Sequence, residues 1–205
     1  MFTLTCYTFP HFQEMANTHP ASEFTAADIV DTFSDSISSA PANLNFLVAN
    51  TRDLPFPDNH FDFVYQAMSM ASFREREWPS VIRELVRVTK PGGWVELFDA
   101  MMSMRDVNLN YLFLKEDALE EAGLENIGRV IQSIPMGWGP VEIAEQSLMG
   151  LRGLMEALKP QMCLALGLGE DEFDDMMTEA EREFVTHKQF WDMMSVWGRK
   201  PVTQN

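Results

Sequence analysis

Two stretches decide the fold: NFLVANTRDLPFPDNHFDFVYQ at residues 45–66 and EWPSVIRELVRVTKPGGWVE at residues 77–96. The first contains two short apolar runs, at residues 46–48 and 61–65, separated by a polar segment rich in proline and aspartate. Short apolar runs bounded by turn residues are typical of buried strands. The first stretch therefore predicts two strands joined by an irregular connection.

The second stretch predicts a helix followed by another strand. Pro79 stands where the first turn of a helix tolerates proline, because that position has no intrahelical N–H bond to lose. Apolar residues then recur at helical spacing, at Val81, Ile82, Leu85 and Val88. Pro91 is expected to end the helix, and the Gly92-Gly93 pair gives the backbone freedom for a turn into a strand. Strands alternating with helices through short connections predict a parallel sheet with helices on both faces.

The rest of the chain continues this alternation. A short helix at residues 12–17 precedes a strand at residues 23–29, which ends at Asp28. Later patterns predict a helix at residues 112–122, which Gly123 ends, and a strand at residues 127–134. A helix is expected to begin at Pro140 and to be broken at Lys159-Pro160. A further helix at residues 170–187 and a closing antiparallel edge strand at residues 190–197 complete the pattern. The pattern as a whole is typical of an α/β protein.

The segments LPFPDNHFDFV at residues 54–64 and RELVRVTKPGG at residues 83–93 resemble, in this order and at this separation, the class I S-adenosylmethionine (SAM)-dependent methyltransferases of the type common in filamentous fungi. The resemblance implies a Rossmann-like parallel sheet with an antiparallel closing edge strand. It also implies one methyltransferase-like domain over residues 1–205. Its core would cover about residues 1–135 and 189–200, and a helical cap would cover about residues 138–188.

The resemblance assigns four residues to the cofactor. Asp28 matches the acidic residue that binds the ribose hydroxyls, and Asn50 the residue that accepts from the adenine amino group, while Thr51 would offer its backbone there. Gln66 ends a strand at the crevice where open α/β sheets bind ligands, a position that lines either the cofactor site or the substrate site. An ordinary turn carboxylate, a turn-capping asparagine and a plain polar strand end are the alternatives. No catalytic base is assigned, because methyl transfer depends mainly on alignment of donor and acceptor.

The glycine-rich turn that the family places after its first strand is missing. Thr5, Tyr7 and Phe9 stand at the glycine positions of the pattern. Because glycine lets the backbone approach a ligand closely, the bulky residues predict weakened binding of SAM. The chain is also expected to be truncated at its N-terminus, since the segment that such enzymes carry before the first strand is absent.

Three functions therefore remain open. In the first, the chain is a methyltransferase that acts on a small molecule or a protein and has a rebuilt cofactor turn. Alternatively, it is a catalytically inactive methyltransferase-like partner or scaffold protein. The third alternative is a truncated gene product that lacks the glycine-rich loop.

Composition narrows the class of partner. The formal net charge of −16 argues against binding of a nucleic acid backbone, and no apolar run approaches the length of a membrane span. Two cysteines indicate a reducing compartment, and the four scattered histidines predict no metal site. We expect a cytoplasmic protein, with the nucleus open. A protein partner or a homodimer also remains open.

Overall fold

The structure is a computed structural model, and it describes residues 2–5, 9–31, 33, 37–69, 72–101 and 110–202. The chain separates into two compact units. The first comprises residues 1–131 with 194–205, and the second comprises residues 132–193. Each unit is described by itself below.

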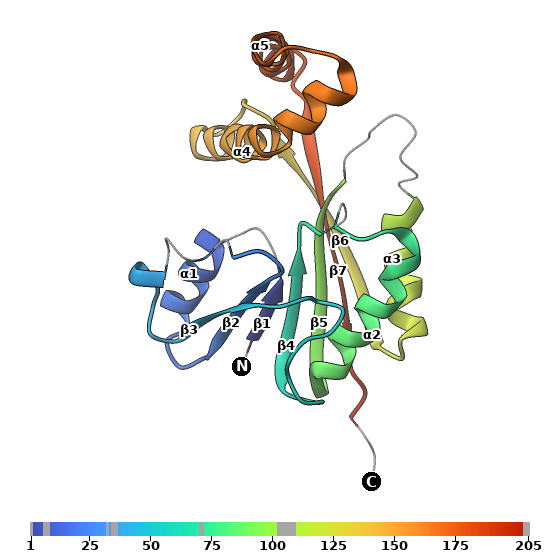
Figure 1. The fold of residues 1–205 in the computed structure, drawn as a ribbon. Coiled ribbons are helices and arrows are strands. Elements are labelled where there is room, and N and C mark those ends of the chain that lie inside the picture. The colour runs from blue at the N-terminus through green and yellow to red at the C-terminus, as the bar shows by residue number, and fades with distance from the viewer. Residues whose placement is uncertain are drawn as a thin grey trace. The chain divides into compact units, whose positions relative to one another are not determined.

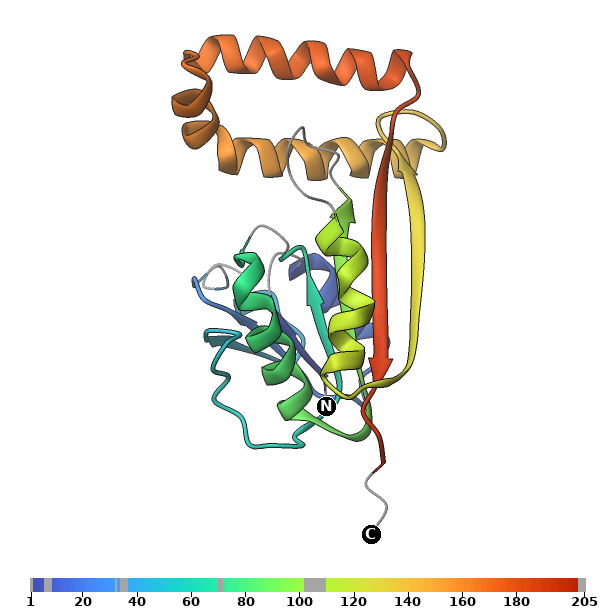
Figure 2. The ribbon, with the colours of Figure 1, turned by 90° about the vertical axis from the view of Figure 1, so that its right-hand side faces the viewer.

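The described residues form a seven-stranded sheet in the order β3-β2-β1-β4-β5-β7-β6 (Figure 1). Its strands are β1 (Phe2–Thr5), β2 (Phe24–Asp28), β3 (Leu44–Val48), β4 (Phe61–Ala67), β5 (Thr89–Met101), β6 (Glu125–Pro135) and β7 (Phe190–Arg199). The five strands from β3 to β5 in this order are parallel, and Figure 2 shows β7 running antiparallel to β5. The predicted α/β class with a mixed sheet is confirmed.

The helices are α1 (Phe9–Thr18), α2 (Trp78–Val88), α3 (Asn110–Glu121), α4 (Val141–Leu166) and α5 (Glu170–Thr186), with short 3-10 turns at Ile37–Ser39 and Glu75–Glu77. Consecutive residues of a strand point to opposite faces of a sheet. Val64 of β4 packs in a cluster with α2, whereas Tyr65 packs against the cluster that contains α1. Helices therefore cover both faces of the first unit.

The main core of the first unit lies between α2 and the sheet. Helix α2 buries its apolar stripe, which consists of Trp78, Val81, Ile82, Leu85 and Val88, against Val64, Val95 and Leu97 among others. Complete burial of such a side chain contributes about 1.5–3 kcal/mol. Since Pro79 lies in the first turn, the helix begins where the sequence predicts.

The end of α2 differs from the prediction. The helix stops at Val88, and β5 begins at Thr89, so Pro91 and the two glycines lie inside the strand. A residue before proline is pushed out of the helical region, which makes Lys90 unsuited to continue the helix. Gly92 has a φ of +79°, and a Cβ on Gly93 would come within 2.7 Å of the Asp62 carbonyl oxygen. The glycines therefore allow an irregular strand that passes close to β4.

Two further predictions need correction. Helix α4 continues through Pro160 to Leu166, and it ends at Gly167, which has a φ of +69°. The antiparallel strand β7 lies between β5 and β6, so β6 is the edge strand. Met194 and Val196 of β7 are buried, as suits an inner strand, whereas Val130 and Ile131 of β6 are exposed.

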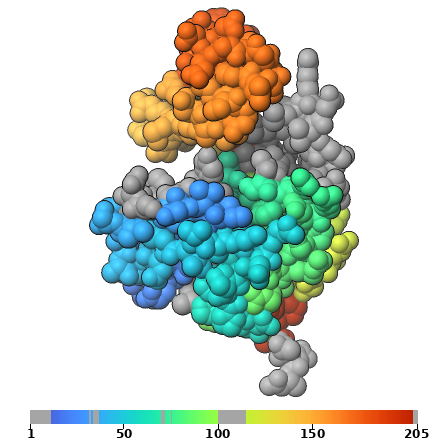
Figure 3. Space-filling view, viewed as in Figure 1, coloured from blue at the N-terminus to red at the C-terminus, as the bar shows by residue number. Residues whose placement is uncertain are grey.

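The polar turn after β3 is fastened to α2. The Leu54 amide donates to Glu84 Oε1 at 2.7 Å, and Arg87 donates to the carbonyl oxygens of Phe56 and Leu54. Figure 3 shows the turn (cyan) and the helix (green) sharing one surface of the first unit. These hydrogen bonds hold the turn against α2 between Leu54 and Asp58.

Candidate functional site

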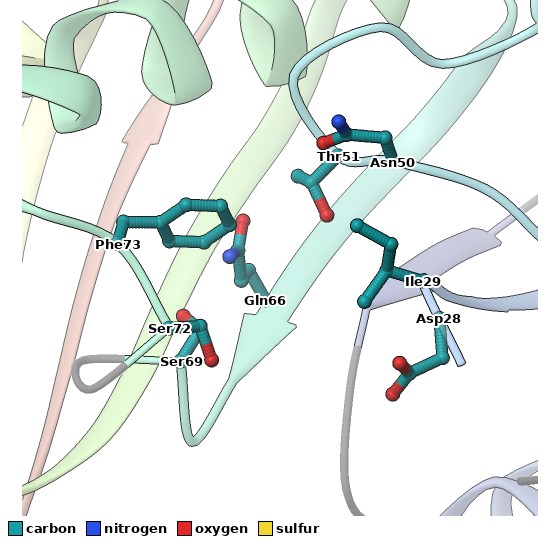
Figure 4. Close-up of a pocket in the computed structure, with 8 residues that line it drawn as sticks. All are labelled: Asp28, Ile29, Asn50, Thr51, Gln66, Ser69, Ser72 and Phe73. Carbon is teal, nitrogen blue, oxygen red and sulfur yellow. The ribbon is translucent and has the colours of Figure 1, made fainter.

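The four residues predicted to bind a cofactor lie together at the carboxyl edge of the parallel strands. Asp28 ends β2, Asn50 and Thr51 follow β3, and Gln66 lies near the end of β4. All four line one pocket with a volume of about 90 Å³ (Figure 4). The register explains this, because Thr5 at the end of β1 pairs with both Ala27 and Gln66. Their role toward a cofactor stays a prediction.

Asp28 is fixed by short-range hydrogen bonds. Its Oδ1 accepts from the Val30 amide at 3.0 Å, and its carbonyl oxygen accepts from the Ala49 amide at 2.8 Å. The second bond joins the end of β2 to the chain that leads to Asn50. The buried carboxylate thus keeps one oxygen, Oδ2, for a further donor.

Asn50 caps a turn, which is the alternative role that its sequence context predicts. Its Oδ1 accepts from the Arg52 amide at 3.0 Å, and its carbonyl oxygen accepts from the Asp53 amide at 2.9 Å. An amide oxygen has two lone pairs, so this bond leaves room for one more donor. Thr51 is buried beside it, and its hydroxyl points toward Gln66 and Ile29 in Figure 4.

Two buried polar atoms of the pocket are unsatisfied. Gln66 and Ser69 are each 1% exposed, yet neither Gln66 Oε1 nor Ser69 Oγ has a hydrogen-bond partner among the described residues. A buried polar atom without a partner costs about 1–3 kcal/mol. A ligand that donates an N–H or O–H to Gln66 Oε1 would remove part of this cost. The two atoms make the pocket suited to a polar ligand.

Apolar side chains form opposite walls of the pocket. Ile29 is 65% exposed, which is high for a large aliphatic residue, and it lies across the pocket from Phe73 (Figure 4). Phe73 packs edge-on against the buried Trp78, with ring centroids 5.3 Å apart, so its position is fixed by the core. Walls of this kind suit a flat, partly apolar group such as a heterocyclic base.

Sequence reasoning missed four lining residues, namely Ile29, Ser69, Ser72 and Phe73. The three that follow β4 stand in a connection without periodicity. One signal is visible in the backbone: Met68, two residues after Gln66, has a φ of +51°. Such a conformation is uncommon outside glycine and often marks functional sites. Ile29 could have been found as the direct neighbour of Asp28.

The predicted obstruction of the cofactor turn by Thr5, Tyr7 and Phe9 falls partly outside the described residues. Tyr7 lies outside the described residues, whereas Thr5 ends β1 and Phe9 begins α1. The pocket bounded by described residues is smaller than the roughly 300–1,000 Å³ of sites for drug-sized ligands.

Across the described residues, no group of three or more His, Cys, Asp or Glu side chains is placed to hold a metal ion. Nor does any described helix combine the length and apolar character required to cross a membrane.

Comparison with known proteins finds relatives of part of the chain. Residues 6–97 match the family described as a methyltransferase domain. The ubiquinone/menaquinone biosynthesis C-methyltransferase UbiE of Shewanella sediminis is 38% identical over 65 residues, which cover 32% of this chain and 25% of that protein. The N-methyltransferase sirN of Leptosphaeria maculans is 22% identical over 193 residues, covering 79% of this chain and 68% of that protein. The chain thus matches only about a quarter of the length of the bacterial relative.

Solved structures share the fold at low identity. The [4+2]-cyclase SpnF superposes with a TM-score of 0.63 at 19% identity, covering 98% of this chain and 75% of that chain. The phosphoethanolamine N-methyltransferase 2 of Haemonchus contortus, in complex with S-adenosyl-L-methionine, gives a TM-score of 0.61 at 12% identity, covering 98% of this chain and 48% of that chain. Residues 6–97 thus match a methyltransferase domain, and the chain shares the fold of these solved structures.

Proposed function

We propose that the chain binds SAM at the carboxyl edge of its sheet and transfers the methyl group to a small-molecule or protein acceptor. The observation that carries this proposal is the pair of unsatisfied buried atoms, Gln66 Oε1 and Ser69 Oγ, in a pocket that also contains a buried strand-end carboxylate. Such a pocket fits a ligand with several hydroxyl and amino donors, which describes the nucleoside part of SAM.

Each lining residue has a role in this proposal. Asp28 accepts from the ribose hydroxyls through its carboxylate, and Ile29 and Phe73 pack against the faces of the adenine ring. Asn50 and Thr51 contact the adenine edge. These roles agree with the orientation of the walls in Figure 4 and with the free acceptor positions described above.

The chemistry requires little of individual side chains. SAM supplies an electrophilic methyl group on a sulfonium, and the protein mainly aligns this group with the acceptor and excludes water. We therefore assign binding and orientation to the residues of the pocket and assign no catalytic base.

Isothermal titration with SAM and S-adenosylhomocysteine tests the proposal. We expect saturable binding, and we expect Asp28→Asn to weaken it about tenfold or more, which corresponds to the loss of a hydrogen bond to a charged group. Asp53→Asn is the matched control, because Asp53 lies in the neighbouring turn without lining the pocket. If neither compound binds, or if both variants behave alike, the pocket is not a nucleoside site.

A second candidate function is supported by the residues at the missing glycine turn. If Tyr7 and Phe9 fill the space of the cofactor's amino-acid end, SAM binds weakly and the chain serves as a non-catalytic partner. A fold does not fix a reaction, and SpnF, described as a cyclase, shares this fold. We expect the double variant Tyr7→Gly, Phe9→Gly to bind SAM more tightly than the wild type. An unchanged affinity would exclude these two side chains as the obstruction.

A further inference from the structure

The second unit contains a groove between α4 and α5 that is separate from the cofactor pocket. The two helices run antiparallel to each other in Figure 2. The groove has a volume of about 560 Å³, and its apolar lining consists of Met149, Met155, Met177 and Phe173. Because all of its lining residues lie within residues 132–193, the groove is a feature of this unit alone.

The helices do not fill the groove with their own side chains. In α4, whose residues are all described, Leu151 is the one buried residue, and in the equally well described α5 it is Phe173. Met149 is 68% exposed, and a Cβ added to Gly153 would meet no atom within 4 Å. Two ion pairs, Arg152–Glu181 and Lys159–Asp174, join the helices across the groove. The apolar lining is thus open to an occupant.

The charge around the groove indicates the kind of occupant. Helix α5 carries eight carboxylates and one arginine, and Glu156 of α4 adds a further carboxylate to the lining. Methionine side chains adapt to varied apolar partners, and an apolar groove between helices commonly receives one face of an amphipathic helix. A second copy of this chain, with a formal net charge of −16, would bring more negative charge to the same place.

We propose that the α4–α5 groove binds a basic amphipathic helix of a partner protein. The partner presents apolar residues at helical spacing to Met149, Met155 and Met177. It presents lysine or arginine residues to Glu156 and to the α5 carboxylates that form no ion pair with α4. Since α5 has 17 residues, the contact extends over about 25 Å, or four to five helical turns.

A labelled synthetic peptide of about 18 residues, with leucine and lysine at helical spacing, tests the proposal by fluorescence anisotropy on the full chain. We expect saturable binding that weakens as salt increases, and no binding of the peptide in which glutamate replaces lysine. Gly153→Leu should fill the groove and weaken binding about tenfold or more. Gly150→Leu is the control, because it lies on the same helix, also has open space around its Cβ, and does not line the groove.

Both variants keep the net charge, so they separate the groove from general attraction to an acidic protein. Equal affinity of wild type and Gly153→Leu would overturn the proposal, and so would a failure of the lysine peptide to bind. Size-exclusion chromatography provides the other decisive outcome. If the wild type is a dimer and Gly153→Leu is a monomer, the groove receives a second copy of the chain and the proposal is wrong.

Discussion

At the level of single residues, Gln66 and Ser69 are the pocket residues with unsatisfied buried polar atoms, and such atoms lower the stability of a fold. Both side chains are buried, and each has a polar atom without a partner among the described residues. Natural proteins satisfy nearly all buried polar groups, so two exceptions in one pocket call for a functional reason. A ligand that supplies the missing hydrogen bonds would provide such a reason.

Gln66→Leu should therefore have opposite effects on stability and on binding. We expect the free energy of unfolding of the ligand-free protein to rise by about 1 kcal/mol, because an unsatisfied acceptor is removed. The affinity for SAM should fall by about tenfold. Urea denaturation and isothermal titration measure the two effects, and Gln161→Leu on exposed α4 is the control. A fall in both quantities would show that Gln66 is a structural residue.

Lys115 and Asp99 form an ion pair of a different kind, buried between α3 and β5. Both side chains are nearly inaccessible, and Lys115 Nζ lies 5.0 Å from the ring centroid of Trp78. Burial lowers the pKa of the Lys115 amine, while the Asp99 carboxylate acts in the opposite direction. The Lys90–Asp62 pair, at 2.9 Å, is similar in chemistry but exposed to solvent.

We expect Lys115→Met to reduce the free energy of unfolding by about 3–5 kcal/mol, because it removes one partner of a buried ion pair. Lys90→Met, the exposed counterpart, should cost less than about 1 kcal/mol. Chemical denaturation compares the two. Similar losses in both variants would mean that water reaches Asp99.

At the level of elements, two charged residues of the motif at residues 83–93 form hydrogen bonds with the turn after β3. Glu84 Oε1 accepts from the Leu54 amide at 2.7 Å and from Arg87 Nη2 at 2.6 Å, while Arg87 Nη1 donates to Asp58 Oδ1 at 2.8 Å. These bonds fasten the turn after β3 to α2. The two motifs that carry the family resemblance are thus the two sides of one contact.

The Glu84 contact predicts a pH dependence. The hydrogen bond from Arg87, with help from the Leu54 amide, holds the pKa of Glu84 below its usual value of 4.5. The folded state therefore binds the proton less readily than the unfolded state, so this stabilisation is complete above pH 4.5 and is lost as the pH falls toward the lower folded-state pKa.

Glu84→Gln should lose about 1 kcal/mol at neutral pH and show a shallower decline of stability in acid than the wild type. Denaturant titrations at several pH values measure this. Glu179→Gln, which alters an exposed pair with Arg182, should leave the wild-type profile unchanged. A wild-type profile in Glu84→Gln would mean that other carboxylates govern acid stability.

The sequence predicts those features that depend on residues close together in the chain. Strands β3 and β4 and helix α2 are specified by local periodicity and turn chemistry, and Asp28 and Gln66 by their places at strand ends. The insertion of β7 between β5 and β6 requires β7 to pair with one segment about 55 residues before it and another about 90 residues before it, which no local pattern encodes. Phe73 joins the pocket because Trp78 holds it there, and that is a tertiary contact.

At the level of the whole molecule, the two units differ in how much they bury. In the first unit, α2 alone buries five large apolar side chains. Across residues 132–193, all of which are described, the buried apolar side chains are Met136, Leu151 and Phe173. Since local stability follows buried apolar contacts, opening of the second unit should cost much less free energy.

Hydrogen exchange followed by mass spectrometry should reveal this difference. We expect backbone amides of α4 and α5 to exchange at least about a hundredfold faster than those of α2, β4 and β5, because few tertiary contacts oppose their opening. SAM should slow exchange near Gln66, whereas the basic peptide should slow exchange in α4 and α5 alone. Equal protection of both units without any ligand would mean that contacts beyond those within residues 132–193 already stabilise the helices. The proposal that a partner helix binds in the groove would then lose its support.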